Sequence, residues 1–416
     1  MISRRQFGAL SAGLLLPRQL LAGSGGDRQM LFIFCAGGWD QSAVFAPLFE
    51  SSSVDMEAEA VRASAGGITF VDHQERPAVR SFFEDWGSQT CLINGFEVRA
   101  ISHEQCTRLL MTGSSGAESD DWAVLTAGNT AQTMLMPHVV VSGPAFSSEY
   151  SSKVVRIGAS GQLPGLIDGS ALQRSDWPVD PMGAQAQALV DAFVRERAAS
   201  LSTSAGRGQE QRYADALSTV LSQADALSDY AEQLQVEINE QTDMLDQLEV
   251  ALSCLQEGLT RTAMIQYDGI WGIGWDTHSD NWYQSLHFEE LFGYLSRLMT
   301  ELSSRTAADG RPLAESVTVV VVSEMGRSPQ LNNWDGRHHW TYTSAMLMGA
   351  GVAGGQVIGG YDEYAIGQNV SLSDGGVSPS GTPLVSGHLG ATLLALAGID
   401  PGDLTGGLQP ITAALR

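Results

Sequence analysis

The chain has 416 residues, of which 47 are acidic and 23 are basic, so its formal net charge is −24 at pH 7. Such a surface repels nucleic acid and anionic lipid headgroups and attracts divalent cations, which argues against a nucleic-acid-binding or membrane-surface protein. The length is enough for one large α/β domain with an insertion, or for two domains.

The N-terminal segment, residues 1–26, has the pattern of an export signal. Ser3-Arg4-Arg5-Gln6-Phe7 is a twin-arginine signature, and the apolar stretch Gly8–Leu16 after it is too short to span a membrane. Ser24 stands where a lipoprotein would carry its lipidated cysteine. We therefore expect twin-arginine export to the periplasm or the medium without a lipid anchor. Removal of the signal takes away three arginines and leaves 47 acidic against 20 basic residues, a net charge of −27.

The first predicted strand, Met30–Cys35, is a short apolar run of the kind that forms a buried strand. It leads into Ala36-Gly37-Gly38-Trp39-Asp40, where the glycines permit a tight turn. Ligands gather at the carboxyl ends of strands in open α/β sheets, so Asp40 is a candidate metal ligand. Taken alone it is a weak one, because Gly-Gly-x-Asp also occurs in ordinary turns.

Strand-like and helical runs alternate along the rest of the chain. The expected strands are Thr90–Asn94, His138–Ser142, Lys153–Ile157, Thr262–Tyr267, Val317–Val322 and Ala345–Met348. The expected helices include Ala78–Trp86, Gln105–Met111, Gly183–Ala198 and Leu286–Ser304. This alternation predicts an α/β fold with a mostly parallel sheet sandwiched between helices, in one domain over residues 27–416.

Residues 200–259 are different, because they are polar, strongly helical and almost free of glycine and proline. Apolar residues recur at heptad spacing from Leu217 to Leu255, with one polar break at Gln241. The stripe fits a coiled coil that joins two chains in a homodimer, or a helical hairpin inserted in the domain and folded against it. The hairpin is the favoured interpretation, with Asp243–Gln256 returning as a helix that covers the sheet.

The four cysteines, at positions 35, 91, 106 and 254, have no zinc-ribbon spacing. Cys35 and Cys91 lie in apolar strand-like runs and are expected to be buried thiols. An oxidising compartment permits a disulfide between Cys91 and Cys106, which the sequence does not decide.

Two short bursts of metal-ligand residues follow two of the predicted strands. The first is Trp275-Asp276-Thr277-His278, and the second runs from Ser323-Glu324-Met325-Gly326-Arg327 to Arg337-His338-His339. Carboxylates and imidazoles bind divalent cations, and an Asp-x-His pair places two donors within a single turn of chain. One burst alone is also explained by loop-capping aspartates and histidines that pack on tryptophans. Both bursts together with Asp40 favour a metal site at the carboxyl edge of the sheet.

Taken in order, these motifs resemble an exported bacterial family, domain of unknown function 1501. The resemblance is carried by the twin-arginine start and by Gly37-Gly38-Trp39-Asp40, Asp276-Thr277-His278, Ser323-Glu324-Met325-Gly326-Arg327 and Gly336-Arg337-His338-His339-Trp340. It covers nearly the whole mature chain. That family is grouped with the alkaline phosphatase and sulfatase superfamily, so the resemblance implies an alkaline phosphatase-like sandwich with metals at the carboxyl edge of its sheet.

The resemblance also implies roles for single residues. Asp40 matches the first metal-binding aspartate of the superfamily. Ser323-Glu324-Met325-Gly326 resembles a Ser-Asp-His-Gly block, in which Glu324 keeps the carboxylate but Met325 replaces the imidazole. The remaining metal positions fall on Asp276, His278 and one or both of His338 and His339.

The segment from His103 to Gly113 resembles the sulfatase segment Cys-x-Pro-Ser-Arg-x-x-Leu-x-Thr-Gly, and the nucleophile position falls on His103. An imidazole there can bind metal, form a covalent phosphoryl intermediate, or act as an acid or base beside a metal-bound hydroxide. Arg327 and Arg337 are candidates for holding the anionic group by forked hydrogen bonds. Structural ion pairs explain both arginines equally well.

These expectations lead to an exported hydrolase of small phosphate or sulfate esters that uses one or two divalent ions, for which zinc, manganese, magnesium and calcium are all suitable. The alternative is a non-catalytic envelope protein on the same fold, which binds a ligand or partner and uses metal only for stability. The substituted nucleophile and Ser-Asp-His-Gly positions motivate this alternative. A third interpretation makes residues 200–259 an interaction arm on a scaffold.

Overall fold

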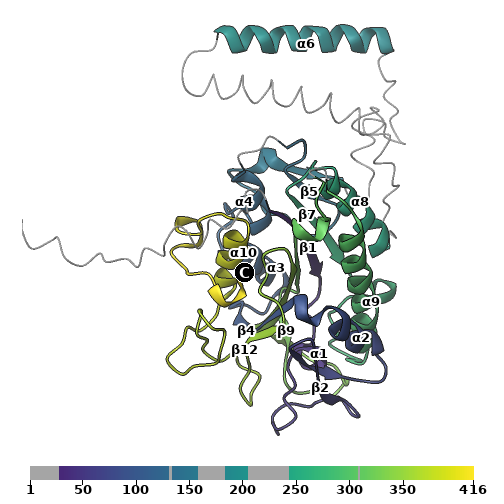
Figure 1. The fold of residues 1–416 in the computed structure, drawn as a ribbon, viewed down its shortest axis with the longest axis vertical. Helices are drawn as coiled ribbons and strands as arrows, with labels where there is room; N and C mark the ends of the chain where they lie inside the picture. The colour runs from purple at the N-terminus through teal and green to yellow at the C-terminus, as the bar shows by residue number, and fades with distance from the viewer. Residues whose placement is uncertain (1–27, 131–133, 158–182, 205–242, 308–309) are drawn as a thin grey trace, which may run out of the picture.

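The computed structural model describes residues 28–130, 134–157, 183–204, 243–307 and 310–416. Within these ranges, one large sheet stands between two layers of helices (Figure 1). None of the helices in these ranges combines the length and the apolarity that a membrane crossing requires. The predicted export signal, residues 1–26, lies outside the described residues.

The large sheet has eight strands in the order β12-β4-β11-β8-β1-β7-β5-β6. Their bounds are β1 Gln29–Cys35, β4 Thr90–Glu97, β5 His138–Val140, β6 Val154–Arg156, β7 Thr262–Tyr267, β8 Val317–Val322, β11 Tyr342–Gly349 and β12 Gln356–Gly359. Within the described sheet only β11 runs antiparallel to its neighbours, β4 and β8. The predicted mostly parallel sheet between helices is therefore confirmed.

Strand β1 divides the hydrophobic core in two, because successive side chains of a strand point to opposite faces. Leu31 and Ile33 pack in one core with the helices α2 (Pro77–Trp86), α8 (Met244–Gln256) and α9 (Tyr283–Ser304). Met30 and Phe32 pack in the other core with α3 (His103–Thr112), α4 (Trp122–Gly128) and α10 (Ser386–Leu396). A central strand buried on both faces explains why β1 and β8 are continuous apolar runs.

Three parallel strands at the centre of the sheet end side by side. In register, Cys35 at the end of β1 is paired with Tyr267 of β7, and Phe34 is paired with Val322 of β8. The loops that follow these strands therefore leave the sheet at one edge. This is the edge at which the sequence predicts the metal site.

Short elements complete this edge. Helix α1 (Gln41–Val44) follows β1 directly, and the strands β9 (Gly326–Arg327) and β10 (His339–Trp340) form a small antiparallel ribbon beyond β8. The ribbon pairs His339 with Arg327. A second ribbon, β2 (Val61–Ala65) with β3 (Ile68–Asp72), lies near α2.

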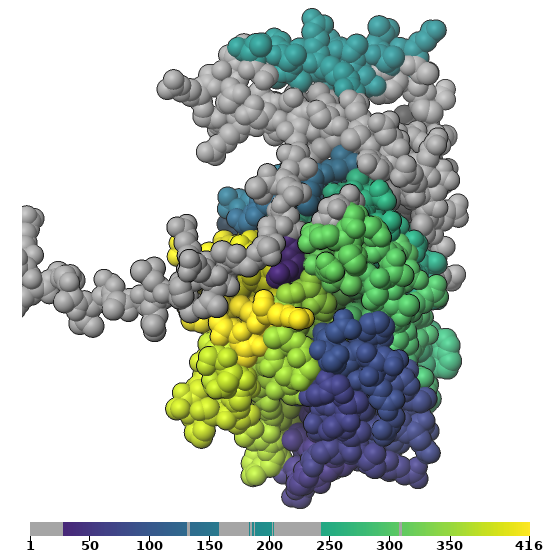
Figure 2. Space-filling view, viewed as in Figure 1, coloured from purple at the N-terminus to yellow at the C-terminus, as the bar shows by residue number. Residues whose placement is uncertain are grey.

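The predicted insertion is described only at its two ends. Helix α6 (Ala184–Ser204) lies apart from the other described elements in the view of Figures 1 and 2. Helix α8 has the bounds predicted for the returning helix to within one residue, and it packs on β7. Residues 205–242, which carry most of the heptad stripe, lie outside the described residues. The choice between a hairpin and a dimerising coiled coil therefore stays a prediction.

The four cysteines are buried free thiols. Burial raises the pKa of both Cys91 and Cys106 to about 12. A thiol with such a pKa is a poor nucleophile at neutral pH.

Candidate metal centre

The loops that follow β1 and β8 are held together at the carboxyl edge of the sheet. Backbone N–H groups of the first loop donate to side chains of the second. The Gly37 N–H donates to both oxygens of Glu324, at 2.9 and 3.1 Å, and the N–H groups of Gly38 and Trp39 each donate to Ser323 Oγ at 3.1 Å. Gly37 has a φ of +123°, and a Cβ there would come within 2.7 Å of the Asp276 nitrogen. Glycine is thus required where the loop after β1 passes the Asp276 loop.

Donor atoms from three separate parts of the chain meet beside these loops. One ligand atom from each of His103, Asp276 and His339 lies within 4.8 Å of the others. His103 Nε2 is 3.3 Å from Asp276 Oδ2, and His339 Nε2 is 3.1 Å from Asp276 Oδ1. His278 Nε2 is 3.2 Å from the same Oδ1 and 2.9 Å from His339 Nε2. We call these four residues the His–Asp cluster.

The far ring nitrogens of two of these histidines are held by acceptors. His339 Nδ1 lies 2.6 Å from the carbonyl oxygen of Ile101, and His103 Nδ1 lies 2.7 Å from Glu324 Oε1. Because a carbonyl oxygen only accepts, His339 Nδ1 carries a proton, and in the neutral imidazole Nε2 then carries the lone pair. An imidazole that ligates a metal is usually held in this way through its other nitrogen.

The cluster is built around a carboxylate that stays ionised. Burial raises the pKa of Asp276, but hydrogen bonds from His103 and Arg327 outweigh this effect and hold that pKa well below its usual range. Hydrogen bonds with Asp276 and then with Glu324 raise the pKa of His103 to about 9. The site thus favours positive charge between its two carboxylates, which a proton or a cation can supply.

Arg327 is fully buried and contacts the cluster through Asp276. Its Nη2 lies 2.6 Å from Asp276 Oδ1, and its Nε donates to the Gly38 carbonyl at 2.8 Å. Nη2 also bonds to the Gly37 carbonyl, and Nη1 donates to the Arg337 carbonyl at 3.1 Å. These contacts make Arg327 a residue that positions Asp276 and the turn after β1.

Asp40 and Arg337 form a separate buried pair. Asp40 Oδ1 caps helix α1 by accepting from the Ser42 N–H at 2.9 Å, and Oδ2 accepts from Asn281 Nδ2 at 2.8 Å. Arg337 Nε lies 2.9 Å from the same Oδ2, but its N–H is out of line for a hydrogen bond, so the contact is an ion pair. Nη1 of Arg337 donates to the carbonyl oxygens of Ser328 and Pro329.

The predicted site residues therefore divide into two sets. The structure brings His103, Asp276, His278 and His339 together, with Glu324 and Arg327 in contact with them. It does not bring Asp40, His338 or Arg337 into the cluster. His338 is exposed, and the nearest cluster ring is that of His278, with the ring centroids 5.7 Å apart. The Ile101 carbonyl was not predicted, because a backbone acceptor leaves no signal in the sequence.

A second group of potential ligand residues has other roles. Glu57, His73 and Glu75 lie near one another, but His73 Nε2 is 3.0 Å from the Ala58 carbonyl and Nδ1 accepts from the Glu75 N–H at 3.2 Å. Glu57 forms an ion pair with the buried Arg76. With both ring nitrogens engaged, His73 is structural.

A groove of about 700 Å³ opens beside the His–Asp cluster. His103 and Glu324 lie in its wall, together with Phe34, Ala36, Gly37, Thr107, Pro144 and Phe146 among others. The His103 side chain is 40% exposed, whereas Glu324 is almost fully buried. The groove thus gives a molecule of moderate size access to the His103 side of the cluster.

Comparison with known proteins gives one match over the whole domain. The model of the family described as "Protein of unknown function (DUF1501)" matches residues 27–412. A comparison with curated proteins found no match.

Several solved structures are similar to this chain at low sequence identity. A protein in the alkaline phosphatase superfamily from Vibrio parahaemolyticus is 8% identical, with a TM-score of 0.38, 94% of this chain covered and 71% of that chain. The PsFucS1 sulfatase from Pseudoalteromonas sp. is 11% identical, with a TM-score of 0.35 and coverages of 96% and 75%. BT4656, solved with its substrate D-glucosamine-2-N,6-O-disulfate, is 8% identical, with a TM-score of 0.32 and coverages of 94% and 82%. All three TM-scores lie below 0.5, so the function is inferred from the residues of this chain.

Proposed function

The chain belongs to the DUF1501 family, and we propose that it is a metal-dependent hydrolase of phosphate or sulfate esters. One observation carries the proposal. Three imidazole Nε2 atoms surround the Asp276 carboxylate beside an open groove, and the far nitrogens of His103 and His339 are held by Glu324 and Ile101.

The donor set fits a divalent cation. Donors that share one tetrahedral ion at bond lengths of about 2.0 Å lie roughly 3.3 Å from each other. The contacts within the cluster measure 2.9 to 3.3 Å. Imidazoles with one carboxylate suit zinc and other transition metals better than calcium or magnesium, which take mostly oxygen ligands. The cluster favours one such ion, whereas a second ion would need donors from outside it.

Each residue of the site has a defined part in this proposal. His103, Asp276 and His339 would hold the cation and leave a fourth position open, with His278 beside them as the further predicted ligand. Such a cation, when bound, would polarise an ester oxygen and activate a water molecule. Glu324 fixes the His103 ring, and Arg327 keeps Asp276 ionised and oriented. His103 faces the groove, where its imidazole lies nearest to an incoming ester. The predicted roles of Asp40, His338 and Arg337 are not part of this proposal and stay untested predictions, as does export by the twin-arginine pathway.

The first test is metal analysis of the purified protein. We expect about one ion per chain in the wild type, and its loss in Asp276→Ala and His339→Ala. His338→Ala is the matched control, because this exposed neighbour lies outside the cluster and its loss should leave the metal content unchanged. No bound metal after supply of zinc, manganese, magnesium and calcium would overturn the proposal.

Hydrolysis of 4-nitrophenyl phosphate and 4-nitrophenyl sulfate tests the chemistry. The metal-loaded wild type and His338→Ala should hydrolyse at least one of them, and His339→Ala should lose at least 100-fold in rate, since the reaction depends on the ion. A metal-loaded wild type without activity on a broad panel of both ester classes would contradict the hydrolase assignment.

A non-catalytic envelope protein is the second candidate function, favoured by two observations. Asp40 is engaged by Ser42, Asn281 and Arg337, and Met325 is fully buried in the apolar core. Among the described residues, this edge thus offers fewer free donors than a two-metal site needs. Metal that raises the midpoint of thermal unfolding without any ester hydrolysis would support this candidate.

A further inference from the structure

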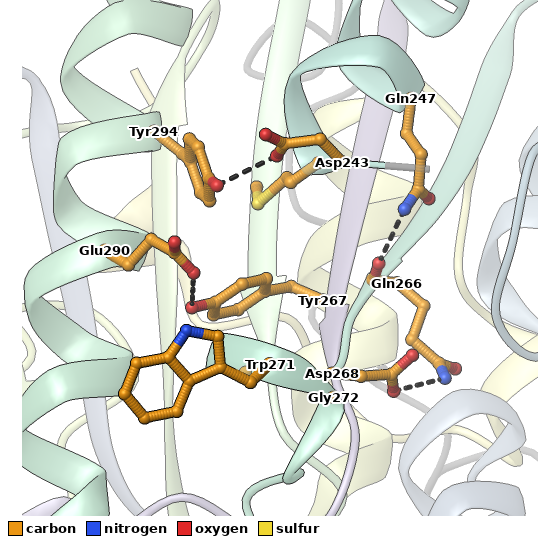
Figure 3. A pocket seen from close by; sticks show the side chains of 11 residues that line it. Asp243, Gln247, Gln266, Tyr267, Asp268, Trp271, Gly272, Glu290 and Tyr294 are labelled. Atoms are coloured by element: carbon orange, nitrogen blue, oxygen red, sulfur yellow. Dashed lines mark hydrogen bonds between the residues drawn. The ribbon is translucent and has the colours of Figure 1, made fainter. Parts of the chain in front are cut away.

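A second hollow, of about 490 Å³, lies at the carboxyl end of β7 (Figure 3). Its walls come from the start of α8, the end of β7, the loop that includes η4 (Ile270–Gly272), and α9. Gln266 lines both this hollow and the groove beside the His–Asp cluster. None of the residues of the proposed metal site lines the second hollow.

Three aromatic side chains form part of the wall. Trp271 is 81% exposed and lines the hollow together with Glu290 and Tyr267, all three labelled in Figure 3. Tyr267 and Tyr294 pack edge to face, with their ring centroids 5.8 Å apart. A large aromatic side chain left exposed at the wall of a hollow is a candidate ligand contact.

Three carboxylates share this wall with the aromatic rings. The Tyr267 hydroxyl donates to Glu290 at 2.5 Å, the Tyr294 hydroxyl donates to Asp243 at 2.8 Å, and Gln266 donates to Asp268 at 2.7 Å. The described residues that line the hollow include no lysine, arginine or histidine. Its electrostatic potential is therefore negative, in a chain whose net charge is already −24.

The three carboxylates do not together form a metal site. In the described part of the chain, they are not among the groups whose ligand atoms all lie within 4.8 Å of one another. Separated carboxylates combined with aromatic faces suit a larger cation, whose charge is spread over carbon-bound hydrogens. We propose that this hollow binds an organic ammonium group, with the exposed Trp271 as the aromatic contact and Glu290 as the main counter-charge.

This inference does not depend on the proposed hydrolase, and a binding measurement tests it directly. The full chain is titrated by calorimetry with choline and, separately, with 3,3-dimethylbutan-1-ol, which has the same shape without the charge. We expect saturable binding of choline at one site per chain, with no binding of the alcohol at the same concentrations. Equal binding of the two compounds, or no binding of choline, would overturn the proposal.

Two variants locate the site. Trp271→Ala should weaken choline binding about 5- to 30-fold, in line with a cation–π contact of roughly 1 to 2 kcal/mol. Trp334→Ala is the matched control, because Trp334 is also exposed, at 70%, but does not line the hollow. Glu290→Gln keeps an oxygen that accepts from Tyr267 and should weaken binding by removing the charge. If Trp271→Ala and Trp334→Ala bind choline equally, the ligand lies elsewhere and the proposal is wrong.

A neutral sugar is the other ligand that an exposed tryptophan can stack on. Glucose is therefore titrated in the same buffer. We expect no binding of glucose, because a neutral ring does not account for three carboxylates in a wall whose described residues include no basic side chain. Binding of glucose that displaces choline would overturn the assignment of a cation site.

Discussion

The proton on each imidazole decides what the His–Asp cluster can bind. His339 is held by a carbonyl that only accepts, and His103 is held by a carboxylate, so both rings are directed to present Nε2 to Asp276. Of the two supports, Glu324 can be changed by substitution, because it is a side chain, whereas the other support is the backbone carbonyl of Ile101. It also accepts from the Gly37 N–H, which ties its position to the turn after β1.

We expect Glu324→Gln to weaken metal affinity about 10- to 100-fold without unfolding the protein, as is typical when the support of a metal-binding histidine is changed. The amide oxygen can still accept from Gly37, but the charge that favours the His103 proton is gone. Competition with a chromophoric chelator measures the affinity. Glu97→Gln removes a partly exposed carboxylate outside the site and should leave it unchanged. Equal affinities for the two variants would exclude the support role.

His138 gives a pH-dependent prediction that is separate from the metal site. Its ring is fully buried between β5 and β7, and burial lowers its pKa from 6.5 to about 4. As the pH falls from about 6.5 to about 4, the unfolded chain takes up a proton that the folded chain does not bind. The free energy of unfolding should therefore fall by up to about 3 kcal/mol over this interval on account of His138.

Urea unfolding of the metal-free wild type and His138→Gln at pH 7.5 and pH 4.5 tests this expectation. The variant should lose less stability between the two pH values than the wild type, although it starts from a lower value. The cluster histidines titrate equally in both proteins and cancel from the comparison. An equal loss in both would show that His138 does not contribute to the acid sensitivity.

Two helices of the sandwich contain a glycine whose substitution should have opposite effects. Gly293 lies exposed in α9, and a Cβ there would meet no atom within 4 Å. Gly390 lies buried in α10, and a Cβ there would come within 2.3 Å of the Trp122 ring. Trp122 is held by its own hydrogen bond to the Leu110 carbonyl, at 2.8 Å, so it cannot move away freely.

Gly293→Ala should raise the free energy of unfolding by about 0.5 to 1 kcal/mol, because alanine restricts the unfolded chain and favours the helix. Gly390→Ala should lower it by about 1 to 3 kcal/mol, because the added methyl group overpacks the interface of α10 with α4. Chemical denaturation measures both. A rise in stability for Gly390→Ala would mean that α10 is less closely packed on Trp122 than described.

The elements also show how far the sequence alone leads. Apolar runs predicted β1, β7 and β8 almost to the residue, because a strand that is buried on both faces has a nearly continuous apolar sequence. The direction of β11 was not predicted, since an apolar run has the same composition in either direction.

The choice of His339 over His338 was likewise not predictable. It depends on the pairing of β10 with β9, which sets the side of the ribbon on which each histidine lies.

The interpretation of Asp40 shows a different limit. Its position after β1 was predicted, but the same aspartate also caps α1 and pairs with Arg337. Arg337 lies far along the chain, and no local pattern links it to Asp40. Local motifs thus located the edge of the site, whereas long-range partners decided which residues meet in the cluster.

At the scale of the whole molecule, the excess of acidic residues opposes folding through self-repulsion. The formal net charge of the full chain is −24. Dissolved salt screens repulsion between exposed charges that lie more than about 10 Å apart at 0.1 M. The folded state should therefore be more stable in moderate salt than at low ionic strength.

We expect the metal-free protein to gain on the order of 1 kcal/mol in free energy of unfolding between 10 and 300 mM salt. Sodium chloride and potassium chloride should act alike, because the effect depends on ionic strength. Chemical denaturation in each salt measures it. A fall in stability with salt would mean that attractive ion pairs outweigh the self-repulsion.

The wide separation of the cluster residues along the chain fixes when the site can form. Asp276 and His339 are 63 residues apart, and His103 and its support Glu324 are 221 residues apart. The donors come together only where β1, β7 and β8 are paired, so the unfolded chain has no preformed site and the proposed ion would load late in folding. The ion that fills the cluster would then be selected by the compartment in which the chain folds, even if the protein acts in another.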